Sequence, residues 1–144
     1  MLNHDWIASH IPHQGSMCLL HSVLQWSAQR VVCDAISHRA PEHPLRAQGR
    51  LGAVVGVEYA GQAMAVHGAL LAPEATAVRH GYLTSVRGLI LYVDRLDQLA
   101  GPIRVSAERL SGDARLVLYR FELEHDGVRL MAGRASVVLD AQAP

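Results

Sequence analysis

The segment LGAVVGVEYAGQAMAVHGALLA, from Leu51 to Ala72, decides the fold. All its positions are apolar or glycine except Glu58, Gln62 and His67, and no proline occurs before Pro73. As one helix, the segment would be about 33 Å long at ~1.5 Å per residue, which is enough to cross a small domain. Because a helix that is hydrophobic on nearly all sides lies in a core, we expect a central helix buried by the rest of the chain.

A membrane span is the alternative that this length and apolarity admit. The composition is against it, since alanine, glycine and valine predominate and a carboxylate lies near the centre. An ionisable group at mid-bilayer costs about 2.5 kcal/mol or more, so we expect no membrane segment.

Glu58 and Gln62 share one face of the predicted helix, whereas His67 points about 180° away from Glu58. A buried carboxylate is expensive unless it is paired, hydrogen-bonded or protonated. Glu58 is therefore the first functional candidate, and the alternative is a structural polar pair with Gln62 or with a backbone group. Gly52 and Gly56 lie on another side, where they indicate close backbone packing against a sheet.

Composition excludes several classes of protein. The 144 residues suffice for a single domain spanning 1–144. Thirteen arginines, no lysine and thirteen acidic residues give a formal net charge of zero, which gives no support for nucleic-acid binding. The only cysteines are Cys18 and Cys33, which we expect to be free thiols in a reducing compartment. No export signal is visible in the first residues, so we expect a cytoplasmic protein.

Strand-like segments flank the central helix on both sides. A short helix is predicted over Asp5 to His10 because Pro12 disfavours its continuation. The predicted strands before the central helix are Met17 to Trp26 and Arg30 to Ser37, followed by a loop over His38 to Gly49.

After the helix we expect a long buried strand over Tyr82 to Val93 with a bulge at Gly88. Three antiparallel strands follow over Ile103 to Leu110, Ala114 to Glu124 and Val128 to Leu139, with turns at Ser111 to Asp113 and His125 to Gly127. A curved antiparallel sheet wrapped around one helix buries that helix with the fewest layers. The predicted class is therefore α+β, with the arrangement called the hotdog fold.

Two blocks of sequence carry a family resemblance over most of the chain. IPHQGSMCLL (Ile11 to Leu20) and GVEYAGQAMAVHG (Gly56 to Gly68) resemble blocks of the beta-hydroxyacyl-[acyl carrier protein] dehydratases. The lead-in AQGRL (Ala47 to Leu51) and the pair Glu58-Tyr59 look more specifically like the dehydratase-like proteins of aryl-polyene biosynthesis clusters.

The resemblance implies a hotdog dimer, either a homodimer or a heterodimer, with a tunnel at the interface. The tunnel would take an acyl chain attached to the phosphopantetheine arm of an acyl carrier protein. No cofactor is implied, since dehydration needs only a proton donor and a proton acceptor. We expect no metal site either, because His10 and His13 have no carboxylate or thiolate pattern beside them.

The resemblance assigns candidate catalytic residues incompletely. In the parent family, a histidine of a Gly-His-Phe-Pro motif faces the glutamate of the other protomer, and that motif is absent here. The nearest match is His43, fifteen positions before Glu58. His13 matches a different histidine, in the opening block, that is not catalytic in the family. We therefore expect Glu58, with a raised pKa, as the acid, and His43, or otherwise His13, as the base or as structural residues.

The candidate substrate-binding residues are Gln62, Gly49, Arg46 and Arg50. The two arginines precede the central helix, where they would steer an acidic carrier protein or remain solvated loop residues.

Three functions stay open on the sequence. The first is an acyl-thioester dehydratase, the second a non-catalytic acyl-binding or heterodimer-partner subunit, and the third a hotdog thioesterase in which a carboxylate activates water. A histidine ring close to Glu58 would favour the first.

Overall fold

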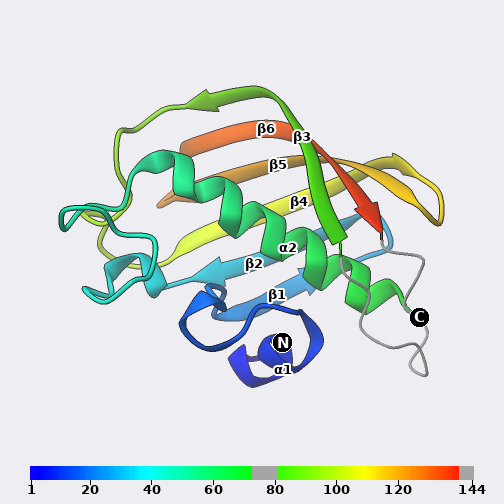
Figure 1. The fold of residues 1–144 in the computed structure, drawn as a ribbon, viewed down its shortest axis with the longest axis horizontal. Coiled ribbons are helices and arrows are strands. Elements are labelled where there is room, and N and C mark those ends of the chain that lie inside the picture. The colour runs from blue at the N-terminus through cyan, green and yellow to red at the C-terminus, as the bar shows by residue number, and fades with distance from the viewer. Residues whose placement is uncertain (73–80, 140–144) are drawn as a thin grey trace.

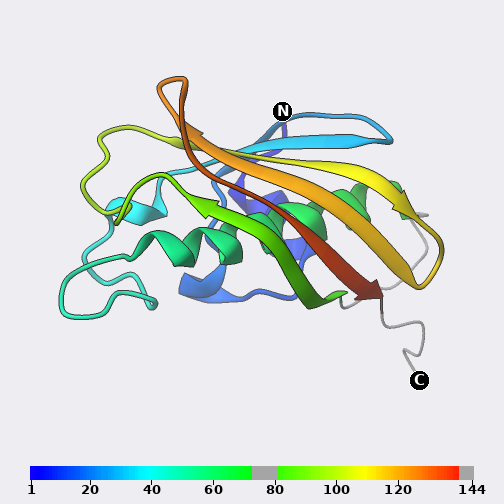
Figure 2. The ribbon, with the colours of Figure 1, turned by 90° about the horizontal axis from the view of Figure 1, so that it is seen from above.

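The computed structural model describes residues 1–72 and 81–139. One six-stranded antiparallel sheet, in the order β1-β2-β4-β5-β6-β3, curves around the long helix α2 (Figures 1 and 2). The helices are α1 (His4–His10) and α2 (Gly56–Leu71). The strands are β1 (Ser22–Trp26), β2 (Arg30–Ala35), β3 (Gly81–Leu91), β4 (Ile103–Gly112), β5 (Leu116–His125) and β6 (Val128–Leu139). The α+β hotdog prediction is confirmed.

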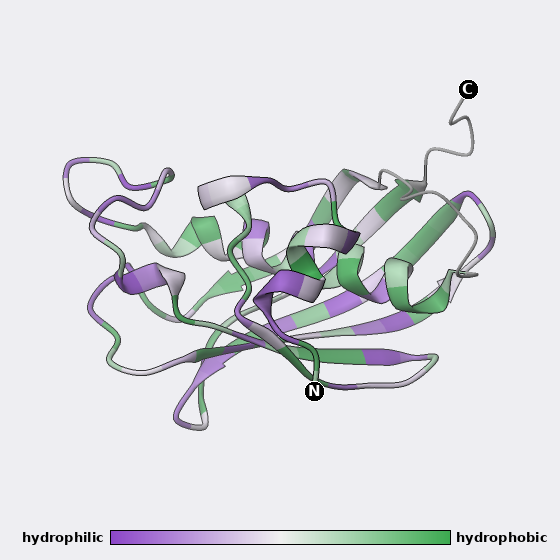
Figure 3. Ribbon diagram, turned by 90° about the horizontal axis from the view of Figure 1, so that it is seen from below, coloured by the Kyte–Doolittle hydropathy of each residue, from purple (hydrophilic) through white to green (hydrophobic). Residues whose placement is uncertain are grey.

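The concave face of the sheet forms the core against α2. Along β5, the buried residues Val117, Tyr119, Phe121 and Leu123 alternate with more exposed ones, which gives one dry face and one wet face. Figure 3 shows this alternation of hydrophobic and hydrophilic residues along the strands. On the helix side the core includes Tyr59, Ala60, Ala63 and Val66, all with no exposed surface.

The central helix is shorter than the sequence suggested. It starts at Gly56, because the preceding residues bond to another loop instead of to their own helix. Leu51 donates its N–H to the Asp97 carboxylate at 3.0 Å and accepts from Leu96 N–H at 2.8 Å, while Ala53 N–H donates to the Asp94 carbonyl at 2.9 Å. These bonds hold residues 51–53 in non-α conformation and fix the angle at which the chain enters α2.

The first strand is also shorter than predicted, since it starts at Ser22 and not at Met17. Backbone bonds to the preceding turn and bonds to side chains replace those of a neighbouring strand over residues 17–20. Gln62 bonds to Met17 O and Leu19 N, and His4 bonds to Leu20 O.

Strand β3 lies at an edge of the sheet, and the prediction that it is buried was wrong. Among the described strands it pairs only with β6, and its large apolar residues Tyr82, Leu83, Ile90 and Leu91 are 42 to 54% exposed. The predicted bulge is present, because the register shifts between Arg87 and Ile90 and Gly88 has a φ of 60°. The Asp126-Gly127 turn is confirmed by positive φ angles at both residues, whereas the preceding turn lies at 113–115, beyond the predicted Ser111 to Asp113.

Two glycines let side chains pass close to the backbone. A Cβ at Gly56 would lie 2.9 Å from Met131 Cε, so the expected close packing against the sheet holds there, although Gly52 has no atom within 4 Å of such a Cβ. Gly133 lies directly opposite Phe121 in the β5–β6 register, and a Cβ there would lie 2.8 Å from Phe121 Cζ.

Replacing Gly133 by alanine is therefore expected to lower the free energy of unfolding by about 1 to 3 kcal/mol, because the buried Phe121 ring must move. Urea unfolding checks this, with Ala132→Ser on the opposite face as the control that should stay within about 0.5 kcal/mol of the native protein. If the urea midpoint of Gly133→Ala equalled that of the native protein, the Phe121 ring would move aside without a cost in stability.

Candidate active site

The least buried stripe of α2 faces a cavity of about 1070 Å³. Val57, Glu58, Gly61, Ala65 and Gly68 lie on this stripe and line the cavity, and each is partly or fully exposed. The remaining walls come from α1 with the residues after it, from β3, and from the β4–β5 end of the sheet. Glu58 is thus directed into a space large enough for a small-molecule substrate.

His13 lies beside Glu58 in the wall of this cavity. Its Nε2 is 3.4 Å from Glu58 Oε1, and the two side chains are 27% and 40% exposed. Within residues 1–72 and 81–139, His13 Nδ1 is buried and has no hydrogen-bond partner. The tautomer with its proton on Nε2 therefore leaves no buried N–H unpaired and directs a donor at the carboxylate.

The contact with His13 lowers the pKa of Glu58 below its usual value, a hydrogen bond from Gln62 lowers it further, and burial opposes both. Position in the first turn of α2 also favours a carboxylate, because the amino end of a helix is positive. The raised pKa expected from the sequence was wrong, since the side chain is neither fully buried nor unpartnered. Glu58 is therefore ionised in this protein near neutral pH.

Gln62 lies one turn beyond Glu58 and has no exposed surface. Its amide oxygen accepts from Leu19 N–H at 2.8 Å, and its amide nitrogen donates to Met17 O at 2.6 Å. It is absent from the cavity wall in the described structure. Gln62 thus fixes the segment that follows His13 onto the same helix that carries Glu58.

The structure places His43 with Tyr59, away from the cavity wall formed by the described residues. His43 Nδ1 accepts from Leu45 N–H at 3.0 Å, and its Nε2 lies 3.0 Å from the Tyr59 hydroxyl. The Tyr59 hydroxyl in turn lies 2.8 Å from Ser37 Oγ, which donates to Leu19 O at 2.9 Å.

One assignment of hydrogen-bond donors and acceptors satisfies every group in this series of hydrogen bonds. His43 Nε2–H donates to Tyr59, Tyr59 donates to Ser37, and Ser37 donates to the Leu19 carbonyl. Both ring nitrogens of His43 are occupied, and burial, together with the nearby Arg46 and His38, lowers its pKa. The arrangement brings His13, and not His43, to the Glu58 carboxylate.

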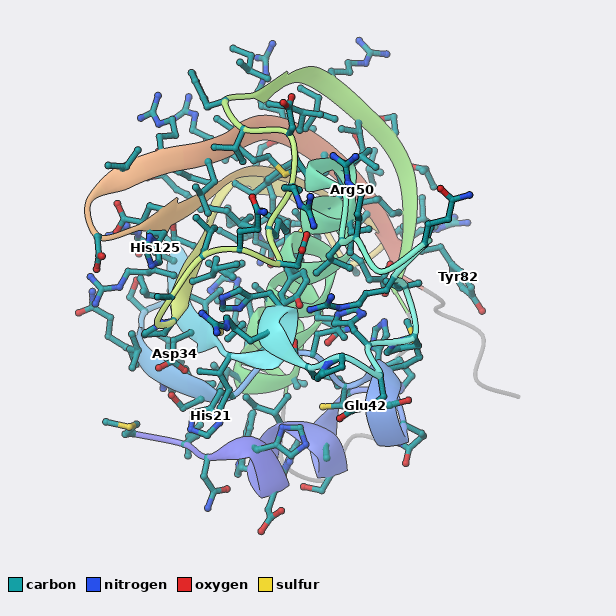
Figure 4. The ribbon with its side chains drawn as sticks, turned by 90° about the vertical axis from the view of Figure 1, so that its left-hand side faces the viewer. His21, Asp34, Glu42, Arg50, Tyr82 and His125 are labelled. Atoms are coloured by element: carbon teal, nitrogen blue, oxygen red, sulfur yellow. The ribbon has the colours of Figure 1, made fainter. Side chains whose placement is uncertain are left out.

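The other predicted binding residues lie in the loop before α2. Arg46 donates to Gly49 O at 3.0 Å and to His38 O at 3.2 Å, so its guanidinium organises the loop backbone. Gly49 is exposed with a φ of 76°. Arg50 is exposed, and Figure 4 shows it on the loops at one end of the molecule.

Two features at the cavity were not found from the sequence. Trp6 and His10, one helical turn apart on α1, stack with ring centroids 4.0 Å apart and line the cavity. Tyr119, at the β4–β5 end, donates to His67 Nδ1 at 2.7 Å, while His67 Nε2 donates to Ser27 O at 2.8 Å. The i, i+4 spacing of Trp6 and His10 was the signal available for the stack.

No helix among the described residues is long and apolar enough to cross a membrane. The same residues contain no group of three or more histidine, cysteine, aspartate or glutamate side chains arranged to hold a metal ion.

Solved structures similar to this chain have the hotdog architecture. A chain from the dehydratase heterocomplex ApeI:P of Xenorhabdus doucetiae matches with a TM-score of 0.85 and 23% identity, covering 99% of this chain and 93% of that one. A mutant form of the thioesterase PA1618 from Pseudomonas aeruginosa matches with a TM-score of 0.65 and 11% identity, covering 95% and 93%. A mutant form of the thioesterase SAV0944 from Staphylococcus aureus matches with a TM-score of 0.60 and 12% identity, covering 83% and 92%.

These structures share the fold of this chain at low sequence identity, so they do not assign its family. Comparison of the sequence with protein-family models does. A search of curated protein sequences found no match. A family model described as ApeP-like, ApeP dehydratase, matches residues 6–143, which is nearly the whole chain. The resemblance seen in the opening block and in the helix block is thereby confirmed, and the chain belongs to the ApeP-like dehydratase family.

Proposed function

We propose that the protein dehydrates 3-hydroxyacyl thioesters carried by an acyl carrier protein, with Glu58 as the proton-transferring group and His13 as its partner. The observation that carries the proposal is the 3.4 Å contact of His13 Nε2 with Glu58 Oε1 in the wall of a cavity of about 1070 Å³. Membership in the ApeP-like dehydratase family supports the reaction class.

The ionised Glu58 carboxylate beside His13 Nε2 suggests the role of each residue. The ionised Glu58 takes the proton from C2 of the acyl chain, and the electron pair released forms the C2–C3 double bond as the C3–O bond breaks. Glu58, now a carboxylic acid, returns that proton to the leaving hydroxyl, which departs as water. The His13 Nε2–H orients the carboxylate throughout, and the enzyme ends in its starting form.

We further propose that the active unit is a hotdog dimer joined at β3. Edge strands carry unpaired backbone N–H and C=O groups, and β3 adds exposed apolar side chains such as Tyr82, Ile90 and Leu91. The similarity to a chain of the ApeI:P heterocomplex supports a partner that is a second, different hotdog subunit. We also propose the cytoplasm as the compartment, since Cys18 and Cys33 are both free.

A heterodimer makes a second function worth testing, in which this chain is the partner of a subunit that supplies a catalytic histidine. The purified chain, alone and co-expressed with a hotdog subunit carrying the Gly-His-Phe-Pro motif, is given a short 3-hydroxyacyl carrier-protein thioester. Mass spectrometry of the carrier protein then follows the reaction.

Loss of water with the purified chain, faster when the second hotdog subunit is present, is the expected result. Turnover only in the presence of the second subunit would assign this chain the partner role. Release of the free acid, with no loss of water, would indicate a thioesterase and contradict both.

A further inference from the structure

The sheet face turned away from α2 carries an ordered grid of side chains on β5, β6 and β3. Figure 2 shows these three strands side by side. The strand registers align three rows, each running across all three strands. The rows are Arg120, Arg134 and Arg87; then Leu118, Ser136 and Ser85; then Leu116, Val138 and Tyr82.

The first row places like charges directly opposite each other. Arg134 faces Arg120 on one side and Arg87 on the other, an arrangement that destabilises a sheet. Arg120 is neutralised by Glu108, whose Oε1 accepts from it at 3.0 Å. Arg87 and Arg134 are exposed and form no ion pair with any residue of the described ranges.

A shallow hollow of about 320 Å³ lies at these two arginines. Its wall includes Arg87 and Arg134 together with Ser85 and Ser136, which face each other across β3 and β6. Guanidinium groups donate only, and hydroxyls donate as well as accept, so the hollow offers several donors to an anionic oxygen.

Apolar surface adjoins the hollow. Leu116, Leu118 and Val138 are 36 to 48% exposed. Contiguous exposed apolar side chains beside charged ones are typical of a protein interaction site. The grid thus combines two unpaired cations with an apolar patch.

We propose that this face docks the acidic, amphipathic helix of another protein. Neighbouring strands are about 4.8 Å apart, so Arg87 and Arg134 have nearly the spacing of two carboxylates one turn apart on a helix, about 5 to 6 Å. Apolar residues on the same helix would cover the leucine and valine positions. Arg87, Arg134 and Leu118 are absent from the cavity wall formed by the described residues, so the contact is separate from substrate binding and goes beyond the proposed dehydration.

Charge balance argues for this partner over two others. The glutamates on this face are already paired, Glu108 with Arg120, Glu122 with Arg129 at 2.8 Å, and Glu124 with Arg104 at 3.9 Å. Among the described residues, a second copy therefore offers no unpaired glutamate from the same face. A net charge of zero also disfavours nucleic acid.

The test measures binding of a labelled synthetic helical peptide that bears glutamates one turn apart beside leucines. Fluorescence anisotropy compares the native protein, Arg87→Gln with Arg134→Gln, and the exposed Arg39→Gln as a matched control. We expect the double variant to bind at least about tenfold more weakly, the control to bind as the native protein does, and salt to weaken native binding.

Without peptide, Arg134→Gln should raise the Tm by about 1 to 4 °C, because like charges no longer face each other.

Equal peptide affinity of the native protein and the double variant would overturn the proposal, as would undiminished binding of a peptide with glutamine in place of glutamate. If the native protein bound a short DNA duplex more tightly than the acidic peptide, the partner of this face would be a nucleic acid. If the native protein self-associated and Arg134→Gln abolished this self-association, the partner of this face would be a second copy of the chain. A lowered Tm for Arg134→Gln would show that Arg134 stabilises the folded protein, which contradicts a role of these arginines in binding.

Discussion

Replacing Glu58 by glutamine is expected to lower the rate of thioester dehydration by about 10³-fold or more, with the fold retained. The amide keeps the shape of the side chain and one acceptor oxygen, but it cannot take a proton from C2 or return it to the leaving hydroxyl. The lowered pKa of Glu58 means that the carboxylate form lost in this variant is the form present near neutral pH. Single-turnover mass spectrometry of the carrier-protein thioester measures the effect, with Glu122→Gln on the opposite sheet face as the control.

Three histidine variants separate the roles of His13 and His43. Glutamine at position 13 can place an amide N–H near the position of the imidazole Nε2, so His13→Gln should keep much of the activity that His13→Ala loses. His43→Asn should lose stability, since it breaks the bond to Tyr59, yet retain its rate per folded molecule. If His13→Gln fell to the level of His13→Ala, the ring itself would transfer a proton. If His43→Asn abolished turnover in folded protein, His43 would be the base.

The sequence predicted the fold well because the pattern of apolar residues is strong. The buried helix positions, the alternation along β5 and the Asp126-Gly127 turn all follow from local rules that the tertiary structure obeys. The misplaced element ends have one common cause. Leu51 to Ala53 and Met17 to Leu20 find hydrogen-bond partners far along the chain, in 94–97 and in Gln62, which no local pattern reveals.

The candidate site was harder to predict from the sequence, because its residues come from separate segments of the chain. Glu58 stood out as a carboxylate in an apolar helix, but its neighbour could not be chosen between His13 and His43 by spacing alone. Forty-five positions separate His13 from Glu58 in the chain, and the Gln62 bonds to Met17 and Leu19 bring the two segments together. The exposure of β3 was missed for a related reason, since an apolar edge strand has the same sequence pattern as a central one.

Lowering the pH from 7.5 to 5.5 is expected to reduce the free energy of unfolding by up to about 1.4 kcal/mol for each of three buried histidines. These are His38, His43 and His67, whose relative exposures are 0%, 6% and 0%. Burial is the main cause that lowers the pKa of each below the ordinary value of 6.5. As the pH falls, the unfolded chain therefore binds protons before the folded chain does, and the unfolded state gains stability from about pH 6.5 downward.

The hydrogen bonds of these three rings explain why the folded state resists protonation. Each ring donates its Nε2–H, His38 to Leu99 O, His43 to Tyr59 and His67 to Ser27 O. A second proton would have to sit on Nδ1, which in His43 and His67 already accepts a hydrogen bond and in His38 is buried without a partner in the described structure. Protonation thus breaks an existing bond or leaves a buried N–H unpaired.

Urea unfolding at a series of pH values, at one fixed protein concentration, checks the expected slope. Replacing His67 by asparagine should lower stability throughout but remove about one proton from the pH dependence. The sign is the decisive feature, since a histidine stabilised by an anionic partner would instead raise stability on acidification. A free energy of unfolding that stays level or rises from pH 7.5 to 5.5 would mean that the three buried rings are protonated in the folded protein. The Nδ1 atoms of His43 and His67 could then not accept from Leu45 N–H and from the Tyr119 hydroxyl.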